Sequence, residues 1–194
     1  MLDAIRSSLE EARAALENLL ADDAVLGQIA AAADTLVESF ENGGRVFSCG
    51  NGGSMCDAAH FAEELTGRYR KDRPGFAAIA INDPGHITCV ANDFGYEEIF
   101  SRYLESHGRM GDLLLALSTS GTSPNVLKAV AAAEKLGMLT IGLTGQADSP
   151  LAKQAGITIV TPAGDYADRV QELHIKVIHL LIELVERKLC PENY

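Results

Sequence analysis

Residues 112–130 read "DLLLALSTSGTSPNVLKAV" and contain a complete transition from strand to helix. The unbroken apolar run from Leu113 to Leu117 is typical of a strand buried on both faces, as in a parallel sheet. Hydroxyl side chains then surround Gly121, and Pro124 follows Ser123 at a position that suits the first turn of a helix. The stretch therefore predicts a strand, a turn and a helix, which is the repeating unit of an α/β fold.

Four further apolar runs have the same character, and most are separated by segments with helical spacing. They are "RVFSCG" (45–50), "GFAAIAI" (75–81), "MLTIGLT" (138–144) and "GITIVTP" (156–162). Each is bounded by Gly, Pro, Asp, Ser or a similar turn residue. We expect an α/β, doubly wound, five-stranded parallel sheet of the flavodoxin-like type, which binds ligands at the carboxyl ends of its strands.

Helical patterns flank these runs and complete a single predicted domain, residues 1–194. Residues 2–20 have a heptad-like apolar stripe, and a second amphipathic helix follows and ends at residues 42–44, "NGG". We expect residues 1–43 to form a helical hairpin, either a lid or an oligomerisation arm, and we favour the arm because the stripe is so apolar. Residues 44–194 would form the α/β core and a final helix, about 167–189, which is apolar almost all round in its second half.

The bulk composition excludes several classes of function. A formal net charge of −11 disfavours nucleic acid and anionic membranes as partners, and no apolar run reaches about 18 residues, the length that spans a bilayer. The N-terminus alternates acidic, basic and apolar residues, so it predicts an amphipathic helix and not a signal peptide. The four cysteines form no CxxC pair, which is typical of reduced thiols in a cytoplasmic protein.

The loop of residues 118–123 predicts a phosphate site. Five of its residues carry hydroxyls, whereas capping the next helix would require only one: Ser118, Thr119, Ser120, Thr122 and Ser123. Hydroxyls and free amides at a helix N-terminus bind phosphate well. Because the lysine of a P-loop is missing, the pattern favours a phosphate monoester over a nucleoside triphosphate with Mg²⁺.

A second glycine turn, in "SCGNGGSMCDAAH" (48–60), has the same strand–turn–helix order. Its glycines fit neither a P-loop nor GxGxxG, so it is either an anion site or a tight turn between strand and helix. His60 and Glu64 follow on one face of the predicted helix. They could be two ligands of one metal, a base beside a ligand, or an ordinary surface pair. We expect Asp57 to be a local hydrogen-bonding group.

The final helix contains three polar residues that could belong to a site, Gln171, His174 and His179. Gln171 and His179 share a broad face of the helix, two turns apart. A histidine within so apolar a helix needs a partner to offset its burial, and a satisfied core histidine is the usual explanation. Periodicity alone does not choose between His174 and His179.

Four motifs together resemble one family. They are "GNGGSMCDAAHFAEELTGRYR", "NDFGYEEIFSRYL", "STSGTSPNVLKA" and "YADRVQELHIKVIH". They are similar to the bacterial sedoheptulose-7-phosphate isomerases, or phosphoheptose isomerases, of the sugar-isomerase (SIS) fold, and the likeness extends almost from end to end. The resemblance implies a homotetramer with active sites between subunits and one Zn²⁺ per subunit. It also implies conversion of sedoheptulose 7-phosphate to D-glycero-D-manno-heptose 7-phosphate, the first step toward ADP-heptose and the lipopolysaccharide core.

The resemblance also implies roles for individual residues. The metal ligands would be His60, Glu64, Gln171 and His179, so that His179 is selected over His174. Glu64 would be the proton-abstracting base, with His179 as its acid–base partner. The substrate-binding positions would be Asn51, Gly52, Gly53, Ser54, Arg68, Asn92, Asp93, Ser118, Thr119, Ser120, Ser123, Asp168 and Gln171.

Two non-enzymatic alternatives share the predicted fold. One is a non-catalytic SIS protein that binds a protein partner such as the bacterial replication initiator, and such relatives lack the carboxylate of the "HFAEE" turn. The other is a module that senses a sugar phosphate, which needs neither metal chemistry nor Gln171 and His179. Because Glu64 is present here, the sequence favours the enzyme.

Overall fold

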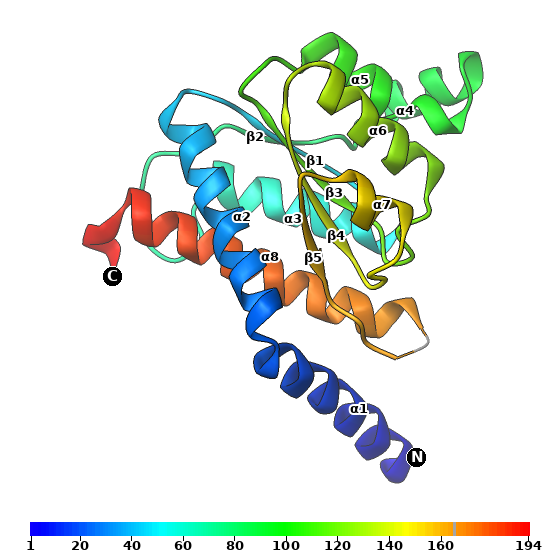
Figure 1. Ribbon diagram of the computed structural model, residues 1–194, viewed down its shortest axis with the longest axis vertical. Coiled ribbons are helices and arrows are strands. Elements are labelled where there is room, and N and C mark those ends of the chain that lie inside the picture. Colours follow the sequence, from blue (N-terminus) through cyan, green and yellow to red (C-terminus); the bar gives the residue numbers. More distant parts are fainter. Residues whose placement is uncertain (165) are drawn as a thin grey trace.

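The computed structural model describes residues 1–164 and 166–194 of the chain, and its centre is one parallel sheet (Figure 1). The strands are β1 (Val46–Cys49), β2 (Ala78–Ala80), β3 (Leu113–Leu117), β4 (Leu139–Thr144) and β5 (Ile157–Val160). Their order in the sheet is β2-β1-β3-β4-β5, and every neighbouring pair is parallel. The predicted doubly wound α/β fold is confirmed, and each strand lies inside its predicted apolar run.

Helices cover both faces of the sheet. One face packs against α2 (Asp23–Glu41), α3 (Gly53–Thr66) and α8 (Ala167–Leu189), with α1 (Leu2–Ala21) at its margin. The other face packs against α4 (Pro84–Asp93), α5 (Ser101–His107), α6 (Pro124–Lys135) and α7 (Pro150–Gln154). Two short 3₁₀ turns, η1 (Tyr96–Glu98) and η2 (Pro191–Asn193), complete the described elements.

Strand β3 shows why these strands are apolar at every position. Leu113, Leu115 and Leu117 belong to the core beneath α2, α3 and α8. Leu114 and Ala116 belong to the core on the opposite face. All five are fully buried, since a strand in the middle of a two-sided layer has no solvent face.

The strand order changes direction between β1 and β3. From β1 the chain moves to the edge strand β2, crosses to β3 on the other side of β1, and continues outward to β4 and β5. In open α/β sheets ligands bind at such a switch point, beyond the carboxyl ends of the strands. The loops at this point are the glycine turn of residues 50–53 and the hydroxyl-rich loop of residues 118–123.

The predicted leading helices are present, but they meet in an open elbow and not in a closed antiparallel hairpin (Figure 1). Asp22 alone separates α1 from α2, which is shorter than the connections that reverse the direction of a helix pair. Its carboxylate caps α2 by accepting from the backbone N–H groups of Ala24 and Val25 at 3.1 Å. Helix α1 therefore projects from the body, with Leu2, Ile5, Leu9, Leu16 and Leu20 exposed.

Candidate active site

Two histidines that are 119 residues apart in the sequence meet where α3 packs against α8. His60 Nε2 lies 3.0 Å from His179 Nε2, and the ring centroids are 5.2 Å apart with the planes inclined by 67°. Tyr69, just beyond α3, also lies beside the His179 ring, with centroids 5.7 Å apart. The structure thus brings together one histidine from each half of the predicted metal and acid–base site.

Two carboxylates flank His60 on its own helix. Glu64 Oε1 lies 3.7 Å from His60 Nε2, on the side that faces His179. Glu63 Oε1 lies 3.0 Å from His60 Nδ1. A proton on Nδ1 would be donated to Glu63, which leaves Nε2 as the free lone pair toward His179. Sequence reasoning missed Glu63, although its spacing of three residues from His60 could have indicated it.

These donor atoms fit a small divalent ion. His60, Glu63 and Glu64 each offer one ligand atom, and these atoms lie within 4.8 Å of one another. In a tetrahedral zinc site with bonds of about 2.0–2.1 Å, neighbouring ligand atoms are separated by about 3.3 Å. The separations of 3.0 Å to His179 and 3.7 Å to Glu64 lie on either side of that value.

Gln171 and His174 lie elsewhere on α8. The Gln171 amide packs against Gly53, where an added Cβ would lie 2.6 Å from Oε1. Gln171 is eight residues from His179, about 12 Å along a helix, so its part in metal binding stays a prediction. His174 is fully buried, and no described residue forms a hydrogen bond with either of its ring nitrogens.

The surroundings shift the acidity of the two predicted acid–base groups. Burial, reinforced by the negative charge of Glu63, raises the pKa of Glu64, while His60 opposes the rise. Burial, followed by the nearby charge of His60, lowers the pKa of His179. A carboxylate with a raised pKa is a stronger base, and a histidine with a lowered pKa stays neutral at neutral pH. The raised pKa of Glu64 and the lowered pKa of His179 therefore both suit proton transfer.

Asp57 differs from the prediction. We expected a local hydrogen-bonding group, but its Oδ2 is buried and no described residue bonds to it. Burial raises the pKa of Asp57, and the nearby His60 partly offsets the rise. Asp57 lies on α3 one turn before the buried Phe61, and no described residue supplies a donor to its Oδ2 there.

The loop of residues 118–123, here called the anion loop after the predicted phosphate site, lies between β3 and α6. Ser118 and Ser123 are joined through their hydroxyls at 3.1 Å, as are Ser120 and Thr122 at 2.9 Å. Ser123 occupies the N-cap position of α6, yet its hydroxyl does not cap the helix. Among the described residues, none accepts from the backbone N–H groups of Thr119, Ser120 and Ser123. Amides and hydroxyls are therefore available together at a helix N-terminus.

Gly121 is required for this loop to exist in its observed form. Its φ is +66°, and a Cβ there would lie 2.2 Å from the Ser149 hydroxyl and 2.8 Å from that of Thr144. A side chain would meet both the strained backbone region and two neighbouring hydroxyls. The loop is thus fixed from behind by β4 and the start of α7 while its front stays open.

A pair of side-chain amides ties the two loops at the switch point together. Asn51 Nδ2 donates to Asn125 Oδ1 at 2.9 Å, and Asn125 Nδ2 donates back to Asn51 Oδ1 at 2.8 Å. The Tyr96 hydroxyl also donates to Asn51 Oδ1, at 3.0 Å. Ser54 lies buried at the start of α3 beside this pair of loops. Sequence reasoning missed Asn125, since an asparagine after a helix-starting proline carries no distinguishing pattern.

Four predicted substrate residues do not join this group within one chain. Arg68 is exposed just beyond the end of α3. Asn92 and Asp93 are exposed at the end of α4, where the Asn92 amide donates to Asp93 at 2.7 Å. Asp168 is exposed in the first turn of α8 and accepts from the backbone of Arg169. Their roles remain predictions.

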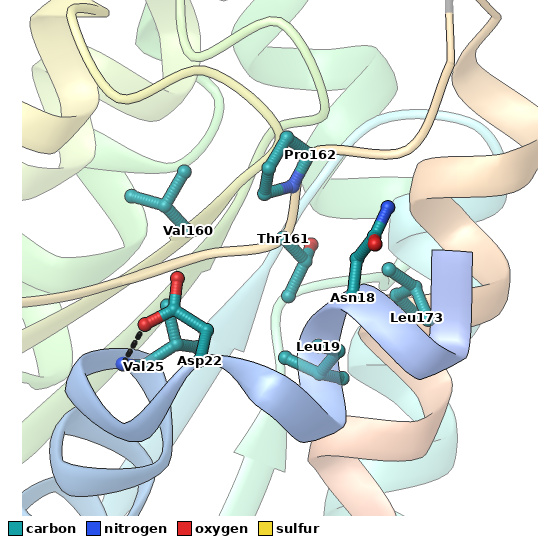
Figure 2. A pocket seen from close by; sticks show the side chains of 8 residues that line it. All are labelled: Asn18, Leu19, Asp22, Val25, Val160, Thr161, Pro162 and Leu173. Atoms are coloured by element: carbon teal, nitrogen blue, oxygen red, sulfur yellow. Dashed lines mark hydrogen bonds between the residues drawn. The ribbon is translucent and has the colours of Figure 1, made fainter. Parts of the chain in front are cut away.

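Two hollows differ in their relation to these residues. One, of about 160 Å³, is bounded by the anion loop at Thr119 and Ser120 and by Gln146 and Tyr166. The other, of about 80 Å³, lies at the elbow of α1 and α2 beside the end of β5 (Figure 2). None of the predicted site residues lines the elbow cavity, whose walls include Leu19, Val25 and Leu173. Of these two hollows, the one beside the loop of residues 118–123 is therefore the one that borders predicted site residues.

The sequence is similar to known proteins over nearly its whole length. Residues 9–145 match the model of the SIS domain. The phosphoheptose isomerase of Pectobacterium atrosepticum is 56% identical over 190 residues, which cover 98% of each chain. The phosphoheptose isomerase of Salmonella paratyphi B is 59% identical over 187 residues, which cover 96% of this chain and 97% of the relative.

Solved structures show the same likeness in three dimensions. The phosphoheptose isomerase GmhA from Neisseria gonorrhoeae superposes with a TM-score of 0.88 at 32% identity, covering 95% of this chain and 98% of the other. A phosphoheptose isomerase from Francisella tularensis gives a TM-score of 0.87 at 35% identity, covering 96% and 98%. Sequence and fold therefore agree on the same group of relatives.

Proposed function

The chain belongs to the phosphoheptose isomerase family of SIS-domain proteins, and we propose that it interconverts sedoheptulose 7-phosphate and D-glycero-D-manno-heptose 7-phosphate. The observation that supports this most directly is the approach of both His179 and Glu64 to His60 Nε2, at 3.0 Å and 3.7 Å. A sensor of sugar phosphates or a protein-binding relative would not need acid–base groups there. We expect the product to supply the heptose of the lipopolysaccharide core.

The phosphate end of the substrate would bind the loop of residues 118–123. Backbone amides of Thr119, Ser120 and Ser123 can donate to it, and the dipole of α6 favours negative charge there. This holds the phosphate against the carboxyl end of β3, while Asn51 fixes the neighbouring loop through Asn125. Gly52, Gly53 and Ser54 would contact the sugar chain, as would Arg68, Asn92, Asp93, Asp168 and Gln171.

Isomerisation moves one proton between two adjacent carbons. Glu64 would remove the proton from C1, and the C–H electron pair would form the C1=C2 bond of the enediol as the C2 carbonyl oxygen gains a proton. Return of a proton to C2, with loss of the proton on the C1 hydroxyl, gives the aldose. The raised pKa of Glu64 strengthens it as a base, and the lowered pKa of His179 keeps its ring neutral and able to accept a proton.

We propose one Zn²⁺ per subunit, held by His60, Glu64 and His179 and completed by Gln171. When bound, zinc stabilises negative charge on the substrate oxygens as a Lewis acid. Support comes from the approach of His179 and Glu64 to His60 Nε2, while Glu63 contacts Nδ1 of the same ring and would orient it. Glu64 cannot be a fully engaged ligand and a free base at once, so it would have to bind the ion loosely.

We further propose a cytoplasmic homotetramer with active sites between subunits. Support comes from the exposed apolar stripe of α1 and from the predicted substrate residues Arg68, Asn92 and Asp93, which are exposed in the single chain. In the part of the chain that the structure describes, no helix is both long and apolar enough to cross a membrane.

An isomerase assay with and without zinc tests the proposal. The purified protein should convert sedoheptulose 7-phosphate, lose this activity on chelation, and regain it when Zn²⁺ is restored. Turnover that is absent after zinc reconstitution would contradict the enzymatic proposal and favour the sensor or the protein-binding alternative. Turnover that survives complete chelation would contradict the zinc proposal alone.

A further inference from the structure

A buried ion pair joins α8 to the end of α3, beyond the catalytic residues. Arg73 Nε donates to Glu186 Oε1 at 2.7 Å, and neither side chain has any exposed surface. The Tyr194 hydroxyl donates to Glu186 Oε2 at 3.0 Å, so both carboxylate oxygens are engaged. Burial and the bond to Glu186 raise the pKa of Tyr194 to about 12, so this hydroxyl remains a donor at neutral pH.

The remaining donors of Arg73 bind the last turn of α3. Nη2 donates to the Glu64 carbonyl at 2.7 Å, and Nη1 donates to the carbonyls of Leu65 and Gly67 at 2.8 and 3.2 Å. Helix ends leave carbonyls without partners, and a cation there also complements the helix dipole. Helix α3 has no basic residue in its own last turn, so Arg73 supplies that charge from outside the helix.

The contacts between α3 and α8 follow one another in the same order along both helices, and the ion pair is the last of them. Helices α3 and α8 run in the same direction, because Gly53 faces Gln171, His60 faces His179, and the end of α3 faces Glu186 through Arg73. The histidine pair therefore lies between a close contact at one end and the buried ion pair at the other. A slip of one residue along either helix would move the donors apart by about 1.5 Å.

The structure leads us to propose that Arg73, Glu186 and Tyr194 are positioning residues that hold His60 and Glu64 in register with His179. Buried ion pairs add little net stability compared with apolar packing, because desolvation offsets their attraction, and fixing a unique register is their best-attested use. In the described part of the chain the triad forms no hydrogen bond with the histidines or the loop of residues 118–123, and its direct bond to a predicted site residue is the one from Arg73 to the backbone carbonyl of Glu64. The expected change in kcat rests on the proposed function, whereas the expected change in the separation of His60 and His179 does not.

Three variants and a matched control test it. Tyr194→Phe removes one hydrogen bond, Glu186→Gln removes the charge, and Arg73→Lys loses the donors to the α3 carbonyls. The control is Arg45→Gln, because Arg45 also forms an ion pair at 2.7 Å with a buried carboxylate, that of Asp112, at the amino ends of β1 and β3 and away from the loops at their carboxyl ends. Urea unfolding gives the free energy of unfolding of all four proteins. Changes at the histidine pair are then compared between a variant and the control that have similar stability.

The decisive readout is geometric and does not depend on activity or metal. In a crystal structure of metal-free Tyr194→Phe or Glu186→Gln, the separation of His60 and His179 Nε2 should increase from 3.0 Å. The affinity for Co²⁺, followed by its visible absorption, should fall about 10-fold or more, as for other residues that orient metal ligands. In the isomerase assay kcat should fall while KM stays near the wild-type value, since the anion loop is built on other elements.

An unchanged histidine separation in both folded variants would overturn the proposal, as would an equal loss of Co²⁺ affinity in Arg45→Gln. If the wild-type protein proved to lack isomerase activity, the proposed function would fail, yet the crystal structures and Co²⁺ titrations would still decide whether the triad sets the register.

Discussion

Gly53 and Gln171 are in direct contact across the α3–α8 interface, so close that a Cβ at position 53 would lie 2.6 Å from Gln171 Oε1. Because the atoms it would meet are the end of a flexible side chain, Gly53→Ala should fold but displace the Gln171 amide. We expect kcat/KM to fall about 10-fold or more, since misplacing a positioning group costs up to about 10²-fold. Gly27→Ala on α2 is the control, because a Cβ there meets nothing within 4 Å.

Adjacent carboxylates allow a matched test of the catalytic base. Glu64→Gln should reduce kcat by about 10²–10⁴-fold, the usual contribution of a general base, while the protein stays folded. Glu63→Gln should act indirectly through His60 and lower zinc affinity or activity by about 10–100-fold. Steady-state kinetics with zinc titration separates them. Retained turnover in Glu64→Gln would exclude Glu64 as the base.

The anion loop should affect binding more than chemistry. Ser120→Ala removes a hydroxyl from the loop and, with it, a hydrogen bond to a charged group that is worth about 1.5–3 kcal/mol. We expect KM to rise about 10-fold or more, with a smaller change in kcat. Ser106→Ala, an exposed hydroxyl on α5, should leave both parameters unchanged. Identical kinetics for the two variants would count against the loop as the phosphate site.

Because of His174, the free energy of unfolding should decrease in mild acid. Burial lowers the pKa of its ring to about 4, and contact with the Thr144 backbone opposes this only in part. Below pH 6.5 the His174 ring takes up a proton in the unfolded chain but stays neutral in the folded chain. The free energy of unfolding therefore begins to decrease near pH 6.5 and stops decreasing below pH 4. At pH 5 the decrease amounts to about 2 kcal/mol. Urea unfolding at pH 7.5 and pH 5 should show this difference shrinking in His174→Leu.

The stripe on α1 should govern assembly. Leu9 and Leu16 are 66% and 44% exposed, and replacing both by Arg should dissociate the proposed tetramer without unfolding the sheet. Ser7→Arg, on the same helix but outside the stripe, is the control. Size-exclusion chromatography with light scattering gives the mass of each protein. A double variant with the mass of the wild type would show that this stripe is not the interface.

Much of the fold could be predicted because each local signal agrees with the final structure. Leu113–Leu117 is apolar at every position because both faces are covered, and residues 167–189 were predicted as a helix with the bounds that are observed. The open elbow at Asp22 was not predicted, since a periodic pattern reports the face of a helix and not its direction.

The site was predictable only in part. Spacing placed His60 and Glu64 together, but it could not place His179 beside them, because that contact depends on how α3 packs on α8. The family resemblance supplied this choice. Arg73 and Asn125 were missed because a buried arginine in a loop and an asparagine in a helix look ordinary until their partners, distant in sequence, are known.

The separation of 119 residues between His60 and His179 also constrains how the protein folds. Contacts this distant in sequence form late, because the entropy of closing the intervening chain must first be offset by other interactions. Strands β1, β3 and β4 can associate through nearer contacts, whereas the apolar face beneath α8 stays uncovered until that helix docks. Catalytic competence should therefore appear in the last kinetic phase of refolding, together with burial of this face.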